Sequence, residues 1–505
     1  MKKNNLFKIL GFVLVGYVLL SWLVPIIVSI FGWKVEASYQ IGLVKFGSTF
    51  IDAFAGFSNI IIFILLVGGL YAVMDATGAY KTTIETLAEK FKGKEKIVLI
   101  TIIVLMAIIS SITGLELALF ILFPFIISLV LMMGYDKIIA LVATFGATIV
   151  GMYGATYAGT LYGYLDGFMQ TKPNDNILAK VIFFVVSLGL LIGFTLIYMK
   201  KHKMLETKSN KKEKKDKKEK KKETKKVVKS ETKKEQSKTE EGNPKKVWPM
   251  LLIMGILFLV FILGTTTWAN IFGKNWFETA HTSIMEWKVG GFAIVEKIFG
   301  GIDALGTWST STRFIPYSIL ILLASTALTL VYKVKLKDAF EAFVKGIKEY
   351  VVPAFLALIA YSLFVFTIYY PVLGVITNWI TGLTDSFSIV TAGIHAMISS
   401  VFHPDFAYYG YYVVNAFIQT QQDTSLYSLI SLIFTNLYSL VMLVAPTSVL
   451  LLTSLSISEV KYTEWLKFIW KYALCLLVVS FIVFTIFIFL FFACAFRQKA
   501  GPAPI

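Results

Sequence analysis

Long apolar stretches, separated by short polar ones, follow one another along nearly the whole chain. Most are close to the ~20 residues that an α-helix needs to cross the hydrocarbon core of a bilayer. They predict an all-α polytopic membrane protein with about nine full spans. The predicted spans are Leu6–Ile30, Asn59–Val73, Ile138–Tyr162, Ile177–Met199, Val247–Thr267, Phe314–Tyr332, Val351–Tyr370, Tyr427–Leu452 and Tyr472–Phe492.

A polar signature occurs twice, each time inside a long apolar stretch. Ile109-Ser110-Ser111 is followed by Glu116, and Ile398-Ser399-Ser400 is followed by Asp405, so the acid comes six residues after the first serine in both copies. The arms of stretches 97–133 and 388–422 are short, which predicts two re-entrant hairpins with polar tips; two thin full spans are the alternative for the first stretch. Matched broken segments in two halves are typical of a transporter with a binding site near the midplane.

The apolar helix after each hairpin contains a polar interruption. In the first half it is Gly154-Ala155-Thr156, and in the second it is Ala445-Pro446-Thr447-Ser448. Proline frees a carbonyl, so the second helix is expected to break there, with Thr447 and Ser448 capping a second half-helix whose free amides favour an anion. Close packing through small residues is the alternative for the first interruption. Both helices are predicted to be discontinuous.

The two tips and the two breaks supply the predicted substrate-binding or ion-binding residues. A carboxylate deep in a bilayer costs ~2.5 kcal/mol or more and usually has a function, so Glu116 has the greatest weight. The alternative for Glu116 and Asp405 is that one or both lie in a water-filled opening or at the interface and only cap a helix. The predicted set is Ser110, Ser111, Thr113, Glu116, Gly154, Ala155, Thr156, Ser399, Ser400, His403, Asp405, Asn436, Pro446, Thr447 and Ser448.

The positive charge is concentrated in one segment. The 505-residue chain has a net charge of +17, and Lys200–Lys246 holds 21 lysines against 9 acidic residues. This composition predicts a disordered linker, with binding of anionic lipid headgroups as an alternative and no nucleic-acid partner. Basic segments stay in the cytoplasm, which places the linker and the amino terminus inside a multi-pass cell-membrane protein. The extra span Val247–Thr267 then inverts the second half relative to the first.

These observations divide the chain into five parts. Residues 1–199 form the first membrane repeat, and 200–246 form the Lys-rich cytoplasmic linker. Residues 247–312 hold the extra span with an exterior or interfacial segment. The second membrane repeat is 313–495, followed by a tail, 496–505. The predicted fold is therefore two inverted repeats, each with a re-entrant hairpin and a discontinuous helix.

Signatures of enzymes and metal sites are weak. The histidines lack metal-ligand spacing, and the glycines of the first broken helix follow no strand, so they do not form a phosphate-binding loop. Cys475 and Cys494 lie roughly 28 Å apart on one predicted helix and cannot pair. Ser399 and His403, four residues apart, are the one hint of a membrane-embedded hydrolase, which is a minor alternative.

Three segments carry a family resemblance. Met133–Ile138, Ala445–Leu450 and Val460–Phe468 resemble the YfcC-type transporters of the anaerobic dicarboxylate-carrier branch of the ion transporter superfamily. The resemblance implies an elevator-type carrier with a scaffold domain and a moving transport domain, and a homodimer. Some members are assigned to basic amino acids, including arginine/ornithine exchange by antiport, and others to dicarboxylates. The second tip, Phe402–Phe406, departs from the small turn of that family.

The predicted function is secondary active transport of a small polar metabolite across the cell membrane. An amino acid is favoured because two acids lie near the site and neither Arg313 nor Arg497 lies in a hairpin or a broken helix. A dicarboxylate or a peptide is the alternative substrate. The expected partners are the small-molecule substrate, membrane lipids and a second copy of the chain. No resident cofactor is expected, although Na⁺ or H⁺ could couple the transport.

Overall fold

The architecture is helical throughout the part of the chain that the structure describes. This computed structural model describes residues 5–30, 39–114, 117–158, 165, 169, 171–172, 175–220, 246–308, 314–421 and 423–499, with side chains left out at 202–220 and 490–499. Within these residues, eight helices are long and apolar enough to cross a membrane. The prediction of an all-α polytopic membrane protein is therefore confirmed.

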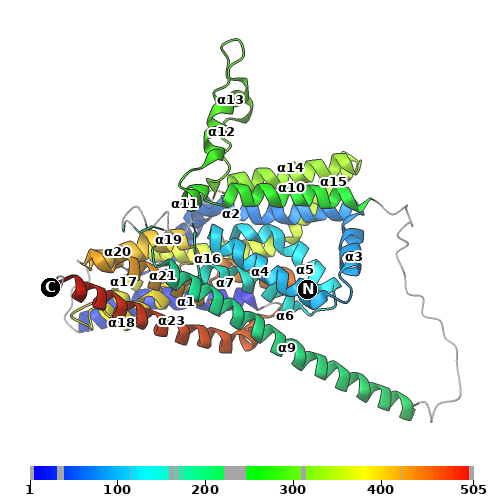
Figure 1. Cartoon of the computed structure of the whole chain (residues 1–505). Helices are drawn as coiled ribbons and strands as arrows, with labels where there is room; N and C mark the ends of the chain where they lie inside the picture. Colours follow the sequence, from blue (N-terminus) through cyan, green and yellow to red (C-terminus); the bar gives the residue numbers. More distant parts are fainter. Residues whose placement is uncertain are drawn as a thin grey trace, which may run out of the picture.

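The first half contains two long helices, a hairpin and a broken helix, followed by a third long helix (Figure 1). Its elements are α1 (Leu6–Ile30), α2 (Leu43–Ala76), α3 (Tyr80–Lys90), α4 (Glu95–Thr113), the 3-10 helix η1 (Leu117–Leu122), α5 (Phe123–Met132), α6 (Lys137–Leu141), the π-helical turn η2 (Val142–Gly146), α7 (Ala147–Tyr153) and α9 (Ile177–Lys220).

The second half repeats this order after an additional helix and a projecting segment. Its elements are α10 (Val247–Thr265), α11 (Trp268–Phe272), α12 (Trp276–Met285), α13 (Ile294–Phe299), α14 (Ile315–Val331), α15 (Leu336–Glu349), α16 (Val351–Tyr369), α17 (Val372–Thr381), α18 (Ile389–Phe402), α19 (Phe406–Tyr409), the π-helical turn η4 (Gly410–Val414), α20 (Asn415–Gln419), the 3-10 helix η5 (Thr424–Leu426), α21 (Tyr427–Met442), α22 (Val449–Ser458) and α23 (Tyr462–Lys499).

The two broken helices run in opposite directions. Lys137, at the start of the first, forms an ion pair of 2.7 Å with Glu459, just after the end of the second. Asn176, which follows the first broken helix, donates a hydrogen bond of 2.9 Å to the carbonyl of Ser428, at the start of the second. Each broken helix therefore begins where the other ends, as inverted repeats require.

The helices form two groups. In the α2 group, α2 packs against α14, α15 and α16, and α10 packs on α14. Only glycine fits where α2 meets α15, because a Cβ on Gly346 would overlap the backbone of Gly68. In the broken-helix group, α4, α9 and α21 surround α7, while α18 and α23 pack on α21. Helices α16 and α22 connect the two groups.

Several boundaries differ from the predicted ones. The predicted span Asn59–Val73 is the second half of the 34-residue helix α2, and α23 starts ten residues before Tyr472. Helix α9 continues to Lys220, so residues 200–220 are helical and not the predicted disordered linker. Lysine and glutamate are good helix formers, and extending a formed helix requires no new nucleus. Residues 221–245 lie outside the described residues.

Candidate substrate-binding site at the hairpin tips and helix breaks

The first hairpin tip packs against the first broken helix. The Ser110 hydroxyl donates to the carbonyl of Thr148 at 2.7 Å, and the Ser111 and Thr156 hydroxyls lie 3.1 Å apart. A Cβ on Gly151 would lie 2.6 Å from the Cβ of Ser110. The hairpin tip can therefore pack this closely on α7 only because residue 151 has no side chain. Helix α7 ends at Tyr153, which places Gly154–Thr156 in the predicted break. Helix α4 is itself long and apolar enough to cross a membrane, so the choice between a re-entrant hairpin and two full spans for 97–133 stays open.

The second tip has the same relation to the second break. The Thr447 hydroxyl donates to the carbonyl of Val401, next to the Ser399-Ser400 pair. Helix α21 ends at Met442, and α22 starts at Val449 with Ser448 as its N-cap, whose hydroxyl accepts from the Leu451 amide at 3.4 Å. The predicted break at Pro446 and the capping role of Ser448 are confirmed. In each repeat the tip is therefore attached to the break of its own half.

Asn436 joins the two broken helices to α23. Its Nδ2 donates to the carbonyl of Tyr153 at 3.1 Å, and its Oδ1 accepts from the Ser480 hydroxyl at 2.6 Å. The Ser480 oxygen also lies 2.7 Å from the Tyr153 hydroxyl. The Asn436 amide is thus used to hold α7, α21 and α23 together in a buried polar network.

Asp405 and His403 fix the second tip. Asp405 Oδ1 accepts from the amide of Ala407 at 2.8 Å as the N-cap of α19, and Oδ2 accepts from the Tyr361 hydroxyl on α16 at 3.3 Å. His403 Nδ1 lies 2.7 Å from the carbonyl of Ser399, and Nε2 lies 3.4 Å from the Thr367 hydroxyl. Both imidazole nitrogens therefore face groups other than the Ser399 hydroxyl, so the Ser-His pair of a hydrolase is not assembled.

The remaining predicted residues either bond within their own helix, lie buried in a helix break, or lie outside the described residues. The hydroxyls of Thr113 and Ser400 bond to carbonyls of their own helices, Ile109 and Ala396. Ala155 is buried within the first break. Glu116 lies outside the described residues, so its role, like the predicted meeting of the two tips at the midplane, stays a prediction. Nearly all other predicted side chains are buried, and their role in binding stays a prediction.

Sequence reasoning missed a buried lysine. Lys180, in the first turn of α9, is 3% exposed and is the only lysine, arginine or carboxylate side chain in the described part that is buried. The bond from Asn176 to Ser428 sets the start of α9 beside the start of α21, and Lys180 follows one turn later. The Asp175 carboxylate is a charged neighbour of its ammonium group, which also has another partner in the structure. In the sequence, Lys180 is one polar residue near the end of a span and carries no motif.

Buried hydroxyls on α21 add hydrogen-bonding capacity near this region. The oxygens of Ser431 and Thr435, four residues apart and hence on one helix face, have no hydrogen-bond partner in the described structure, and neither has His395 Nδ1 on α18. The His395 ring packs between Phe417 and Phe434, with centroids 5.2 and 5.7 Å away. Buried polar groups almost always have partners, so these atoms are candidates for contact with a ligand.

Comparisons with known proteins place this arrangement in a wider context. The family model described as C4-dicarboxylate anaerobic carrier matches residues 4–403. An uncharacterized protein of Haemophilus influenzae is 29% identical over 93 residues, which is 18% of this chain and 18% of that protein. The crystal structure of the Alcanivorax borkumensis YdaH transporter superposes with a TM-score of 0.41 at 10% identity, over 94% of this chain and 98% of that one.

Proposed function

The chain belongs to the family of C4-dicarboxylate anaerobic carriers, and we propose that it is a secondary active transporter that moves a small dicarboxylate across the cell membrane. The observation that carries the substrate class is the buried ammonium group of Lys180. A buried charge in a membrane is costly and usually serves a substrate or ion pathway. A cation there suits an anionic ligand, because charge-assisted hydrogen bonds to carboxylates are the strong ones.

Two further groups in the second half of the chain also suit a carboxylate. Ser431 and Thr435 add buried hydroxyls without a hydrogen-bond partner in the described structure, on the helix whose Ser428 carbonyl accepts from Asn176. The second break supplies the amino end of α22, where free amides and the helix dipole favour negative charge. Lys180 with the hydroxyls and the amino end of α22 are thus two separate places that would each suit a carboxylate.

An amino acid is the second candidate substrate. Asp405 places a carboxylate at the second tip, where its two oxygens accept from Ala407 and Tyr361. A substrate with an ammonium group would gain an ion pair there, which a plain dicarboxylate would not. A carboxylate on the same molecule could still use Lys180.

Alternating access would come from movement of the broken-helix group against the α2 group, as in an elevator. The tips and breaks are attached to each other within the broken-helix group, whereas the Asp405–Tyr361 contact crosses to the α2 group. We propose that the α2 group is the scaffold and mediates a homodimer. The Lys-rich segment and the amino terminus would be cytoplasmic, following the positive-inside rule.

The test of the proposed function is uptake by purified protein in proteoliposomes. Vesicles with an imposed Na⁺ or H⁺ gradient receive labelled C4-dicarboxylate, a basic amino acid or aspartate, and empty vesicles provide the background. Gradient-dependent accumulation of the C4-dicarboxylate is expected, with competition by unlabelled dicarboxylates. Accumulation of the basic amino acid alone would reject the dicarboxylate in favour of the second candidate.

Substitutions at the first tip separate ion coupling from packing. Glu116→Gln keeps the shape of the side chain but removes its charge change, so transport is expected to lose its pH dependence. Ser110→Ala removes one hydrogen bond to the carbonyl of Thr148, worth only ~1 kcal/mol, and is expected to keep the pH profile. Uptake rates from pH 5 to 8 for both variants decide this, and an unchanged profile in Glu116→Gln would reduce Glu116 to a capping residue.

A further inference from the structure

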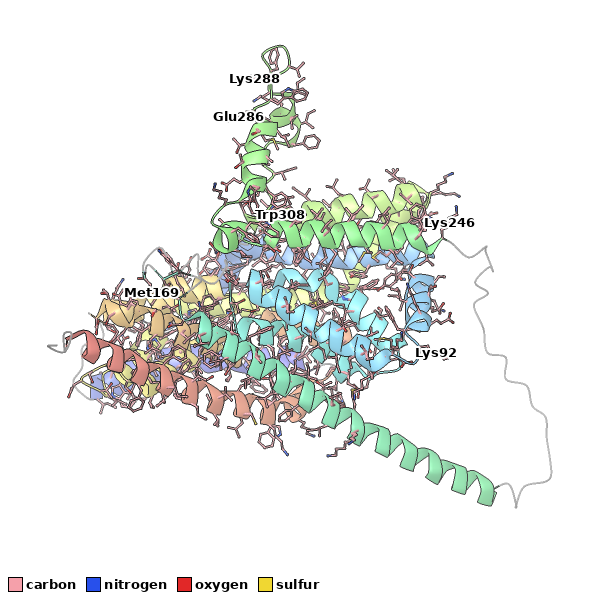
Figure 2. All side chains as sticks on the ribbon, in the orientation of Figure 1. Lys92, Met169, Lys246, Glu286, Lys288 and Trp308 are labelled. Carbon is pink, nitrogen blue, oxygen red and sulfur yellow. The ribbon has the colours of Figure 1, made fainter. Side chains whose placement is uncertain are left out.

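A helical arm stands out from the bundle between α10 and α14. It consists of α11, α12 and α13, and Figure 1 shows α12 and α13 lying crosswise to α10 and α14, away from the rest of the molecule. In Figure 2, Glu286 and Lys288 mark its outer part and Trp308 marks its base, while Lys246 marks the opposite end of α10. The arm therefore leaves the bundle at the end of α10 that lies away from the Lys-rich segment.

The base of the arm is fixed to α10. Trp308 is buried, and a Cβ on Gly264 would overlap its ring, so the indole lies flat against the end of α10. The Trp268 indole donates to the carbonyl of Leu263 at 2.9 Å, and the Gly306 amide donates to the carbonyl of Gly264 at 3.0 Å. These contacts set the direction of the arm relative to the spanning helices.

Beyond its base the arm has no core of its own. None of the residues in α11, α12 or α13 is buried. Large apolar side chains are nevertheless exposed there, with Trp276 at 57%, Ile284 at 54%, Phe292 at 74% and Ile298 at 66%. Helices this short are marginal in water, so another surface must cover them.

The exposed apolar residues share one face. At 100° per residue, the apolar side of α12 faces away from its polar side, and α13 is divided in the same way. The apolar positions are Trp276, Phe277, Ala280, Ile284, Trp287, Ile294 and Ile298. The polar positions are Glu278, Thr279, Thr282, Glu286, Glu296 and Lys297. A short amphipathic helix with tryptophan on its apolar face is typical of the membrane–water interface.

We infer that the arm lies on the surface of the bilayer, with the apolar face of α12 and α13 inserted among the lipid headgroups. Its base joins two helices of membrane-spanning character, α10 and α14, which expose apolar side chains such as Leu252, Ile256 and Leu323 along their length. An arm crosswise to these helices runs along the membrane plane at the level where α10 ends. With the Lys-rich segment in the cytoplasm, this is the outer leaflet.

The experiment places nitroxide labels on the two faces of α12. Cys475 and Cys494 are replaced by serine, and Ile284→Cys or Thr282→Cys is labelled in nanodiscs of phosphatidylethanolamine and phosphatidylglycerol. We expect the label at 284 to collide often with oxygen and rarely with a water-soluble nickel chelate, and the label at 282 to show the reverse. Ile298→Cys and Lys297→Cys form the same matched pair on α13.

Two outcomes would overturn the inference. Equal access of the nickel chelate to positions 284 and 282 would place the arm in water. Protection of position 284 from both reagents, with spin–spin broadening that disappears on dilution with unlabelled protein, would mean that a second copy of the chain covers the arm. Elution of each variant as a single peak in detergent shows that it is folded before labelling.

Discussion

Uptake of the C4-dicarboxylate is expected to fall by roughly 10- to 150-fold in Lys180→Met, because a hydrogen bond to a charged group contributes ~1.5–3 kcal/mol. Methionine has a similar length and no charge, so the buried position stays filled. Because the substitution also leaves Asp175 without this cationic neighbour, elution as a single peak in detergent must first show that the variant is folded. The measurement is initial uptake in proteoliposomes at matched protein content.

Three companion variants test what Lys180 does. Lys180→Arg keeps the charge and should retain part of the uptake, while Thr435→Val should lower uptake without changing expression. Ser325→Ala, on α14, removes a hydroxyl that bonds within its own helix and should leave uptake unchanged. Full recovery of uptake in Lys180→Met combined with Asp175→Asn would show that Lys180 only neutralises Asp175, and would remove it from the substrate site.

A second large loss is expected in Gly151→Leu. A side chain at this position would overlap the backbone carbonyl of Ala107 and the side chain of Ser110, so α4 could not reach α7. The hairpin tip and the first break would separate, and uptake should fall to background with loss of the single elution peak in detergent. Overpacking of this kind costs typically 1–3 kcal/mol and more where backbone is in the way.

The matched control is Gly189→Leu on α9. Gly189 is exposed, and nothing lies within 4 Å of a Cβ built on it. This variant should elute and transport like the natural protein, which shows that leucine in a spanning helix is not itself harmful. Normal transport by Gly151→Leu would mean that α4 and α7 are not packed as described.

The sequence was most informative where the chain must break a regular pattern. Pro446 and the serine after it predicted the end of α21 and the cap of α22, because proline cannot donate and serine caps well. The repeated serine signature predicted two tips, and both tips pack on breaks of their own half. Residues at such positions are limited by local chemistry, which a single sequence shows.

The partners of individual polar side chains could not be predicted in this way. Asn436 was expected to face a ligand, yet its amide bonds to Tyr153 and Ser480, which are far away in the sequence. Lys180 was overlooked because its burial depends on the packing of α9 against α7, α23 and α4, which are distant from it in the sequence. Long-range packing decides which of many serines, threonines and lysines become buried, and periodicity does not encode it. The same holds for residues 200–220, where the helix α9 overrides a composition typical of disorder.

The network around Asn436 also has a consequence for how the protein is made. The Tyr153 carbonyl accepts a hydrogen bond from the side-chain amide of Asn436, which comes 283 residues later in the chain. The Tyr153 hydroxyl contacts the hydroxyl of Ser480, which comes 327 residues later. At synthesis rates of about 5–20 residues per second, the first repeat waits roughly 15 to 60 seconds for these partners. During that interval the Tyr153 carbonyl and hydroxyl lack the Asn436 and Ser480 partners that they have in the folded protein. The first repeat is thus a nascent-chain intermediate that only the last helix of the protein completes.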